Sequence, residues 1–289
     1  MFYGLEKEAN QLLKAFSAQF GLDITRWDSH RLQYFTDAYP VFAFLVIWMD
    51  EFGLTDYVTH FDEILKAGVF AVAGYGILDE NVDGESPSPV EILVAQSLLA
   101  EYETRALNVF GVTRQNLEIM NRMRMLFLDA EIREKQARYK TSPYQLDAPE
   151  QLGAKGANSV APFMLSLEKA GKAHLINEYW QVFLLFGAAI QLMDDWIDLE
   201  MDLAHGHYSY LTLGCLEKAI KGDPKTMATQ LRSDQDLIKA TFLQGKKMIK
   251  QSRDILKKLK EPLLGKMVDI TEYRFDSYFR MKLMLKDPA

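Results

Sequence analysis

The stretch Gln191-Leu-Met-Asp194-Asp195-Trp-Ile-Asp198-Leu-Glu-Met-Asp202 closes a long apolar segment of the chain. Gln191 and the aspartates recur at steps of three and four residues, which places them on one face if the segment is helical; the aspartates are Asp194, Asp195, Asp198 and Asp202. We call these four aspartates the downstream acidic cluster. Carboxylates one turn apart repel each other, and joining them to a buried segment costs free energy unless cations neutralise them. The cluster therefore predicts a site for hard divalent cations such as Mg²⁺, because oxygen ligands suit that ion.

A similar pattern occurs upstream, where an apolar segment starting at Phe70 runs into Asp79, Glu80 and Asp83. We call these three residues the upstream acidic cluster. The helix dipole disfavours acidic side chains at a helix C-terminus, so both segments break the same rule. Two apolar helices that end in carboxylates predict a cavity with metal ions at its mouth and apolar walls. Such a site suits the departure of diphosphate from a hydrocarbon, since Mg²⁺ neutralises the charge on the leaving group.

The composition predicts a globular protein without a nucleic-acid partner. The chain has 289 residues, 48% of them hydrophobic, and can bury a large core. Its net charge is −7, and its basic residues are scattered rather than gathered in a stripe. The single cysteine, Cys215, cannot form an internal disulfide, and charged residues at positions 6–8 interrupt the region where a signal peptide needs an apolar core. We therefore expect a cytoplasmic protein. Because the longest apolar runs fall short of the ~20 residues that cross a bilayer, we expect no transmembrane segment.

Apolar residues recur at helical spacing over most of the chain, whereas the alternation typical of strands is scarce. One helix start is predicted at Ser88, with Pro89 in the first turn and Glu91 as the capping-box acid. We predict an all-α fold, a single domain over residues 1–289 with about ten helices around a central apolar cavity. The stretch from Tyr139 to Asn158 is expected to be irregular, since glycine, proline and polar residues interrupt it.

The residues around the downstream acidic cluster resemble the second aspartate-rich motif of the class I isoprenoid synthases, which include trans-prenyl diphosphate synthases and terpene synthases. In that family an apolar helix carries Gly, then Gln, then a DDxxD, and Gly187, Gln191 and the cluster follow in that order here. The upstream acidic cluster is similar to the first aspartate-rich motif, with Glu80 in place of the second Asp. One departure is His207, which stands where the family usually has a Lys. The resemblance covers about half of the chain and implies the isoprenoid synthase fold.

The resemblance also implies roles for individual residues. Lys155 lies roughly where the family has a diphosphate-binding Lys, whereas Lys140 matches the family's Lys-Thr dipeptide in letters but lies too far upstream. Gln191 is expected to orient a metal ligand or the nascent cation. The resemblance implies three Mg²⁺ ions when a prenyl diphosphate is bound. It also implies assembly as a homodimer. The implied metal ligands are Asp79, Glu80, Asp83, Asp194, Asp195, Asp198 and Asp202.

Some residues that members of this family carry are absent from this chain, and their absence bears on the expected reaction. Chain-elongating members of the family carry an Arg pair after the first motif and a Gly-Lys-x-x-Arg element near the N-terminus, which hold a second diphosphate. Here Asp83 is followed by Gly-Glu-Ser-Pro, and the N-terminal region offers only Arg26 and Arg31. A site without those cations binds a second diphosphate poorly. We therefore expect a terpene synthase that ionises an allylic prenyl diphosphate and then cyclises or deprotonates the cation.

Two alternatives remain open. The first is a prenyltransferase that joins the cation to a non-diphosphate acceptor or to isopentenyl diphosphate, and the second is a non-catalytic helical partner subunit. Outside the motifs, Arg274 and Tyr278 could reach a diphosphate, although basic residues in a last helix also suit its dipole. Tyr75 could close the cavity floor or simply pack in the core. Arg133 belongs to a helix face that we expect to be solvated.

Overall fold

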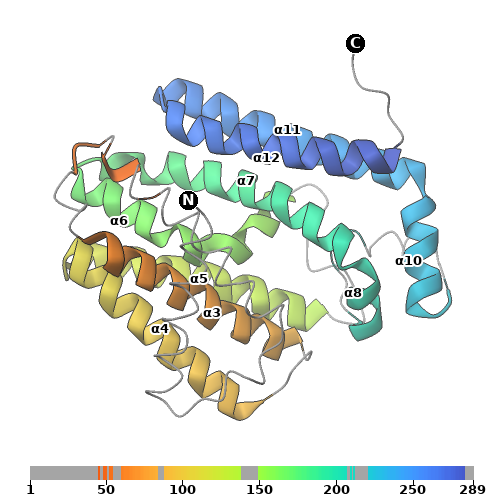
Figure 1. Cartoon of the computed structure of the whole chain (residues 1–289), viewed down its shortest axis with the longest axis horizontal. Coiled ribbons are helices and arrows are strands. Elements are labelled where there is room, and N and C mark those ends of the chain that lie inside the picture. Colours follow the sequence, from red (N-terminus) through yellow and green to blue (C-terminus); the bar gives the residue numbers. More distant parts are fainter. Residues whose placement is uncertain are drawn as a thin grey trace. The chain divides into compact units, whose positions relative to one another are not determined.

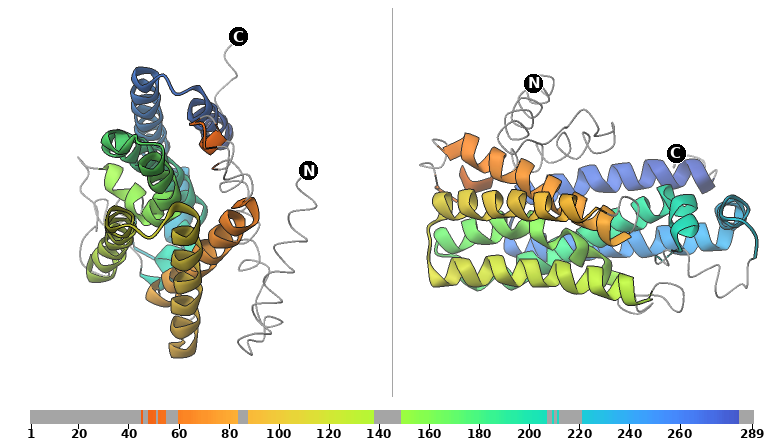
Figure 2. Two further views of the ribbon diagram at one scale, coloured as in Figure 1. Left: turned by 90° about the vertical axis from the view of Figure 1, so that its left-hand side faces the viewer. Right: turned by 90° about the horizontal axis from the view of Figure 1, so that it is seen from below.

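The computed structural model describes residues 45, 48–50, 52–54, 60–83, 88–137, 149–206, 209, 211 and 221–283. These residues include nine α-helices and two 3₁₀-helices and no strand, so the predicted all-α class is confirmed. Figure 2 draws the described elements as coiled ribbons, without arrows. Among these helices, none has an apolar stretch of the length that a bilayer crossing requires. In chain order the elements are α3 (Phe61–Asp83), α4 (Pro89–Phe110), α5 (Arg114–Ala137), η3 (Pro149–Val160), α6 (Ala161–Lys169), η4 (Ala173–Leu175), α7 (Ile176–Ile197), α8 (Leu199–His205), α10 (Pro224–Ser233), α11 (Gln235–Leu259) and α12 (Pro262–Leu283).

The described residues fall into two compact units. One lies within Met1–Arg122 and Ser159–Ala173, and the other lies within Met123–Asn158 and His174–Ala289. The first unit contains α3, α4 and α6, and the second contains α7, α8, α10, α11 and α12. The single domain and its central apolar cavity stay predictions.

In the first unit, α3 and α4 lie side by side (Figure 1). Gly74 allows this close approach, since a Cβ there would lie 2.8 Å from the Leu99 side chain. The predicted helix start at Ser88 is confirmed, because its side chain accepts a hydrogen bond from the Glu91 N–H. Where the sequence predicts the Glu91 carboxylate as acceptor for the Ser88 N–H, the structure has Oδ1 of Asn81 at 2.7 Å. This bond ties the start of α4 to the last turn of α3.

The described part of the stretch that we expect to be irregular is a 3₁₀-helix, η3, so this expectation is wrong from Pro149 onward. Packing against other helices explains the difference. A Cβ on Gly153 would lie 1.9 Å from the Leu184 carbonyl oxygen of α7, so only glycine fits this contact. On α5, Arg133 donates to Oε1 of Gln151 at 3.0 Å, and it is therefore not part of a solvated face. Leu184 and Arg133, which η3 contacts, are distant from it in the sequence, so no local pattern could have predicted this helix.

In the second unit, α7, α11 and α12 pack against one another. Gly245 of α11 makes room for Phe275 of α12, since a Cβ there would lie 2.0 Å from the ring. The Phe275 and Phe279 rings are 4.6 Å apart between centroids, and Phe279 lies 6.0 Å from the Trp196 ring. This aromatic cluster joins α12 to the carboxyl end of α7, where the downstream acidic cluster lies.

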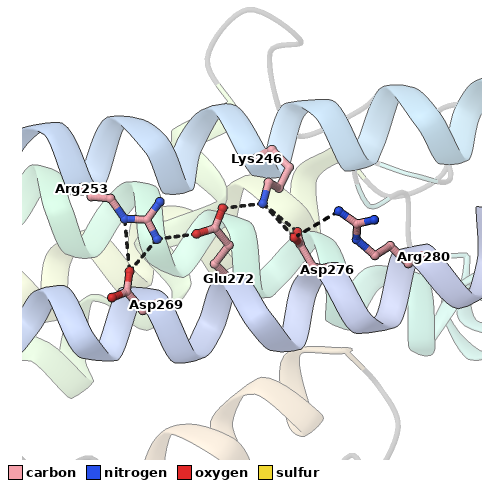
Figure 3. Close-up of polar contacts among 6 residues, drawn as sticks. All are labelled: Lys246, Arg253, Asp269, Glu272, Asp276 and Arg280. Atoms are coloured by element: carbon pink, nitrogen blue, oxygen red, sulfur yellow. Dashed lines mark hydrogen bonds and ion pairs between the residues drawn. The ribbon is translucent and has the colours of Figure 1, made fainter. Parts of the chain in front are cut away.

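Figure 3 shows an ion-pair network between α11 and α12, which we call the α11–α12 ladder. It contains three basic and three acidic residues, so it carries no net charge. Arg253 pairs with Asp269 at 2.6 Å and also with Glu272, while Lys246 pairs with Glu272 and, at 2.8 Å, with Asp276. The six members are Lys246, Arg253, Asp269, Glu272, Asp276 and Arg280.

Replacing Glu272 by glutamine is expected to flatten the acid side of the pH dependence of stability. Partial burial alone would raise the pKa of Glu272, but hydrogen bonds from Arg253 and Lys246, together with their charges, hold the pKa below its ordinary value of 4.5. Because the folded pKa is the lower one, Glu272 stabilises the fold above the unfolded pKa, and this contribution is lost as the pH falls through the folded value. Urea unfolding at pH 7 and pH 3 should show a smaller fall in the free energy of unfolding in the variant, by about 1 kcal/mol.

Asp254 provides the control for this experiment, because it is an exposed acid on α11, next to Arg253, and lies outside the ladder. The Asp254→Asn variant should keep the wild-type pH dependence. A Glu272→Gln variant with the wild-type pH dependence would contradict the role given to the ladder.

Candidate functional site

The upstream acidic cluster lies at the carboxyl end of α3. Glu80 is buried and Asp79 is half-buried, while Asp83 is the last residue of α3 and its side chain lies outside the described ones. Between them, Asn81 donates to the Ile77 carbonyl at 2.8 Å and accepts from the start of α4. The carboxyl end of α3 is the negative end of its helix dipole, as the sequence pattern suggests, and α3 has no basic residue in its last turn that would offset these acids.

The downstream acidic cluster lies where α7 gives way to α8. The backbone N–H of Asp198 donates to the Asp194 carbonyl at 2.9 Å, and that of Asp202 donates to the Asp198 carbonyl at 2.9 Å. The helical turn therefore continues through the one-residue break, and these three aspartates lie one turn apart along one face. Asp198 is exposed, whereas Asp195 is only 5% exposed. The four carboxylates thus range from solvent-exposed to buried.

A hydrogen bond orients the buried member of the downstream acidic cluster. Nε2 of Gln191 donates to Oδ1 of Asp195 at 2.9 Å, one turn along α7. A buried carboxylate is costly unless polar groups bind it, so this amide both stabilises Asp195 and sets its direction. The role of Gln191 in orienting a metal ligand stays a prediction.

Two residues on other helices lie near the downstream acidic cluster. On α10, Nη2 of Arg232 donates to the Ile197 carbonyl at 3.0 Å and so places a positive charge at the carboxyl end of α7. On α12, burial raises the pKa of Tyr278 above its ordinary value of 10.0. The Arg232 charge opposes this shift, while the charges of Asp198 and Asp194 add to it, so the phenol lies within the field of the cluster. From the sequence, Tyr278 is a residue that could reach a diphosphate, whereas Arg232 is not predicted, because its approach depends on how α10 packs against α8.

Lys155 lies in η3, and the structure pairs it with a residue that sequence analysis did not select. Its Nζ is 3.9 Å from Oε1 of Glu131 on α5, and the two side chains are only 15% and 4% exposed. Lys155 is therefore not an ordinary solvated lysine. The alternative, Lys140, lies outside the described residues.

Three further candidates from the sequence, Arg274, Arg280 and Tyr75, lie on α12 and α3. Arg274 is exposed on α12, and Arg280 lies 3.9 Å from Asp276 in the ladder. Tyr75 is half-buried and packs edge-on against Tyr102 of α4, with 6.5 Å between ring centroids, which fits its interpretation as a core residue.

The donor chemistry of the downstream acidic cluster fits Mg²⁺ bound together with a diphosphate. In the described part of the chain, no three His, Cys, Asp or Glu side chains gather closely enough to hold a metal by themselves. However, Mg²⁺ typically uses one or two protein carboxylates, with substrate phosphates and waters completing its octahedral shell. The cluster offers carboxylate oxygens at one-turn intervals and no sulfur ligand, so it matches that mode of binding.

Comparison with known proteins identifies the fold. No family model matches the chain, and no curated protein matches it in sequence. Among solved structures, it is similar to a geranylgeranyl pyrophosphate synthetase from the archaeon Geoglobus acetivorans, with a TM-score of 0.62 and 12% identity over 94% of this chain and 98% of that one. It is also similar to the T. brucei farnesyl diphosphate synthase solved with risedronate, with a TM-score of 0.56 and 15% identity over 94% of this chain and 96% of that one. The predicted resemblance is thus confirmed at the level of the fold, which is that of the prenyl diphosphate synthases.

Proposed function

We propose that the chain is a Mg²⁺-dependent prenyltransferase that removes diphosphate from an allylic prenyl diphosphate and joins the prenyl group to an acceptor. The observation that carries this proposal is the downstream acidic cluster, with Asp195 buried and bonded by Gln191 at the end of an apolar helix. The likeness in fold to two prenyl diphosphate synthases supports transfer more than the cyclisation expected from the sequence.

In the proposed reaction, the allylic C–O bond breaks and its electron pair leaves with the diphosphate. Bound Mg²⁺ would neutralise the charge that develops on this leaving group. Lys155 binds a diphosphate oxygen, and Gln191 holds Asp195 in place. The acceptor supplies the electron pair of the new bond to the prenyl carbon and then loses a proton. The proposed Mg²⁺ ligands are the acids of both clusters, Asp79, Glu80, Asp83, Asp194, Asp195, Asp198 and Asp202.

A second candidate is the terpene synthase. One observation favours it: the residues after Asp83 are Gly-Glu-Ser-Pro, which lack the cations that would hold a second diphosphate. In that reaction the cation loses a proton or closes a ring instead of meeting an acceptor.

One assay separates these functions. The purified protein is incubated with Mg²⁺ and geranyl, farnesyl or geranylgeranyl diphosphate, with and without isopentenyl diphosphate. A longer diphosphate that forms only with isopentenyl diphosphate supports transfer to that acceptor, whereas a hydrocarbon formed from one substrate supports the terpene synthase. Diphosphate release that requires an added acceptor such as an amine or a phenol supports transfer to a non-diphosphate acceptor. No diphosphate release under any pairing would contradict both candidates and favour a non-catalytic partner subunit.

A further inference from the structure

The pairing of Lys155 with Glu131 is a contact between two largely buried, oppositely charged side chains. Their atoms Nζ and Oε1 are 3.9 Å apart, and the carboxylate is the more buried of the two, with 4% exposure. Either charge alone would be unfavourable in this position, because burial favours the neutral form of both a lysine and a glutamate. Each therefore stabilises the charged form of the other.

The segment that carries Lys155 is held on two sides by other contacts. Two residues earlier, Gly153 packs directly on the backbone of α7 at Leu184. The neighbouring Gln151 accepts the hydrogen bond from Arg133 of α5. Because all of these residues belong to one compact unit, the backbone of Lys155 is fixed with respect to α7, the helix that ends in the downstream acidic cluster.

We propose that Glu131 is a positioning residue for Lys155, and that it keeps the ammonium charged and directed for binding the diphosphate of the substrate. This inference rests on the proposed function. A separation of 3.9 Å is too long for a hydrogen bond, so the attraction is electrostatic. An ammonium has three N–H donors and can serve more than one acceptor, so Lys155 can keep Glu131 on one side while it binds a phosphate oxygen on another.

The test is the Glu131→Gln variant, which keeps the side-chain shape and removes the charge. Its KM for the prenyl diphosphate should rise about tenfold, while kcat changes less, because the lost interaction acts on binding. The KM of the variant should also rise further as the pH increases, since an uncompensated buried lysine loses its proton more easily. Another charged side chain that α5 brings to this segment is Arg133, and α7 has no ionisable residue between Tyr179 and Asp194.

Arg133 provides the matched control, because it also links α5 to the Lys155 segment but bonds Gln151. The Arg133→Gln variant should raise KM far less than Glu131→Gln does, and Glu131→Asp, which retains the charge, should recover much of the lost affinity. In the double variant with Lys155→Gln, the Glu131→Gln change should add little, since both act through one ammonium. A KM within twofold of wild type in Glu131→Gln would overturn the inference, and so would an equal rise in Arg133→Gln.

Titration calorimetry with Mg²⁺ and inorganic pyrophosphate separates this inference from the proposed function. If the wild type releases no diphosphate from any prenyl substrate, the proposed function fails, and the calorimetry still decides the role of Glu131. Weaker pyrophosphate binding by Glu131→Gln than by Arg133→Gln, with both variants folded by circular dichroism, supports the inference. Equal binding by both variants overturns it.

Discussion

The Asp194→Asn variant is expected to lose activity while it keeps its fold. With an allylic prenyl diphosphate and Mg²⁺, kcat/KM should fall by about a thousandfold, because the amide cannot supply the negative charge that holds a cation at the leaving group. The same change removes one negative charge from the carboxyl end of α7 and from its repulsion with Asp198 one turn away. The free energy of unfolding should therefore stay constant or rise by up to about 1 kcal/mol. Steady-state kinetics and urea unfolding measure the two effects.

Glu200 is the matched control, because it is an exposed acid in the same segment, between Asp198 and Asp202. The Glu200→Gln variant removes the same charge from a side chain that is not among the proposed ligands, so its kcat/KM should stay within about threefold of wild type. If Asp194→Asn retained wild-type kcat/KM, the assignment of the downstream acidic cluster to Mg²⁺ would be wrong. An equal loss in both variants would mean that only the overall negative charge of the segment matters.

The Gly153→Ala variant is expected to be strongly destabilised. The added Cβ would lie 1.9 Å from the Leu184 carbonyl oxygen and 3.0 Å from the Ala188 nitrogen, and backbone atoms cannot move aside as a flexible side chain can. Either η3 or α7 must shift, which should cost at least about 3 kcal/mol in the free energy of unfolding. Thermal unfolding followed by circular dichroism should show a melting temperature lower by roughly 6–12 °C. Because Lys155 lies two residues away, the KM for the prenyl diphosphate should rise as well.

The same helix supplies the control for this change. Gly156 is exposed, and a Cβ there would meet nothing within 4 Å, so Gly156→Ala should leave the melting temperature within about 2 °C of wild type. A Gly153→Ala protein as stable as Gly156→Ala would show that η3 does not pack on α7 as described.

The parts of the fold that sequence analysis predicted correctly are those that depend on neighbouring residues. The helical class follows from apolar spacing along single segments. The start of α4 at Ser88 and Pro89 follows from which groups can satisfy the first backbone N–H groups of a helix. The position of the downstream acidic cluster at the end of α7 follows in the same way, since the run from apolar to acidic residues is continuous in the chain.

Contacts between distant segments could not be predicted in this way. The helix η3 has no strong local signal, and it forms where Gly153 meets α7 and Gln151 meets α5. Likewise, Arg232 reaches the end of α7 from 35 residues away, and Glu131 reaches Lys155 from another helix. These contacts depend on the directions of long side chains, which are set only when the helices pack.

The sequence by itself therefore determined that the protein is helical and that two apolar segments end in carboxylates, because spacing, capping and charge are properties of single segments. Only the tertiary structure decided which cation lies beside the downstream acidic cluster, which carboxylate accompanies Lys155, and which acid is buried and bonded by Gln191. The physical reason is that burial and long-range charge pairing arise when segments come together, and the chain order alone does not specify those distances.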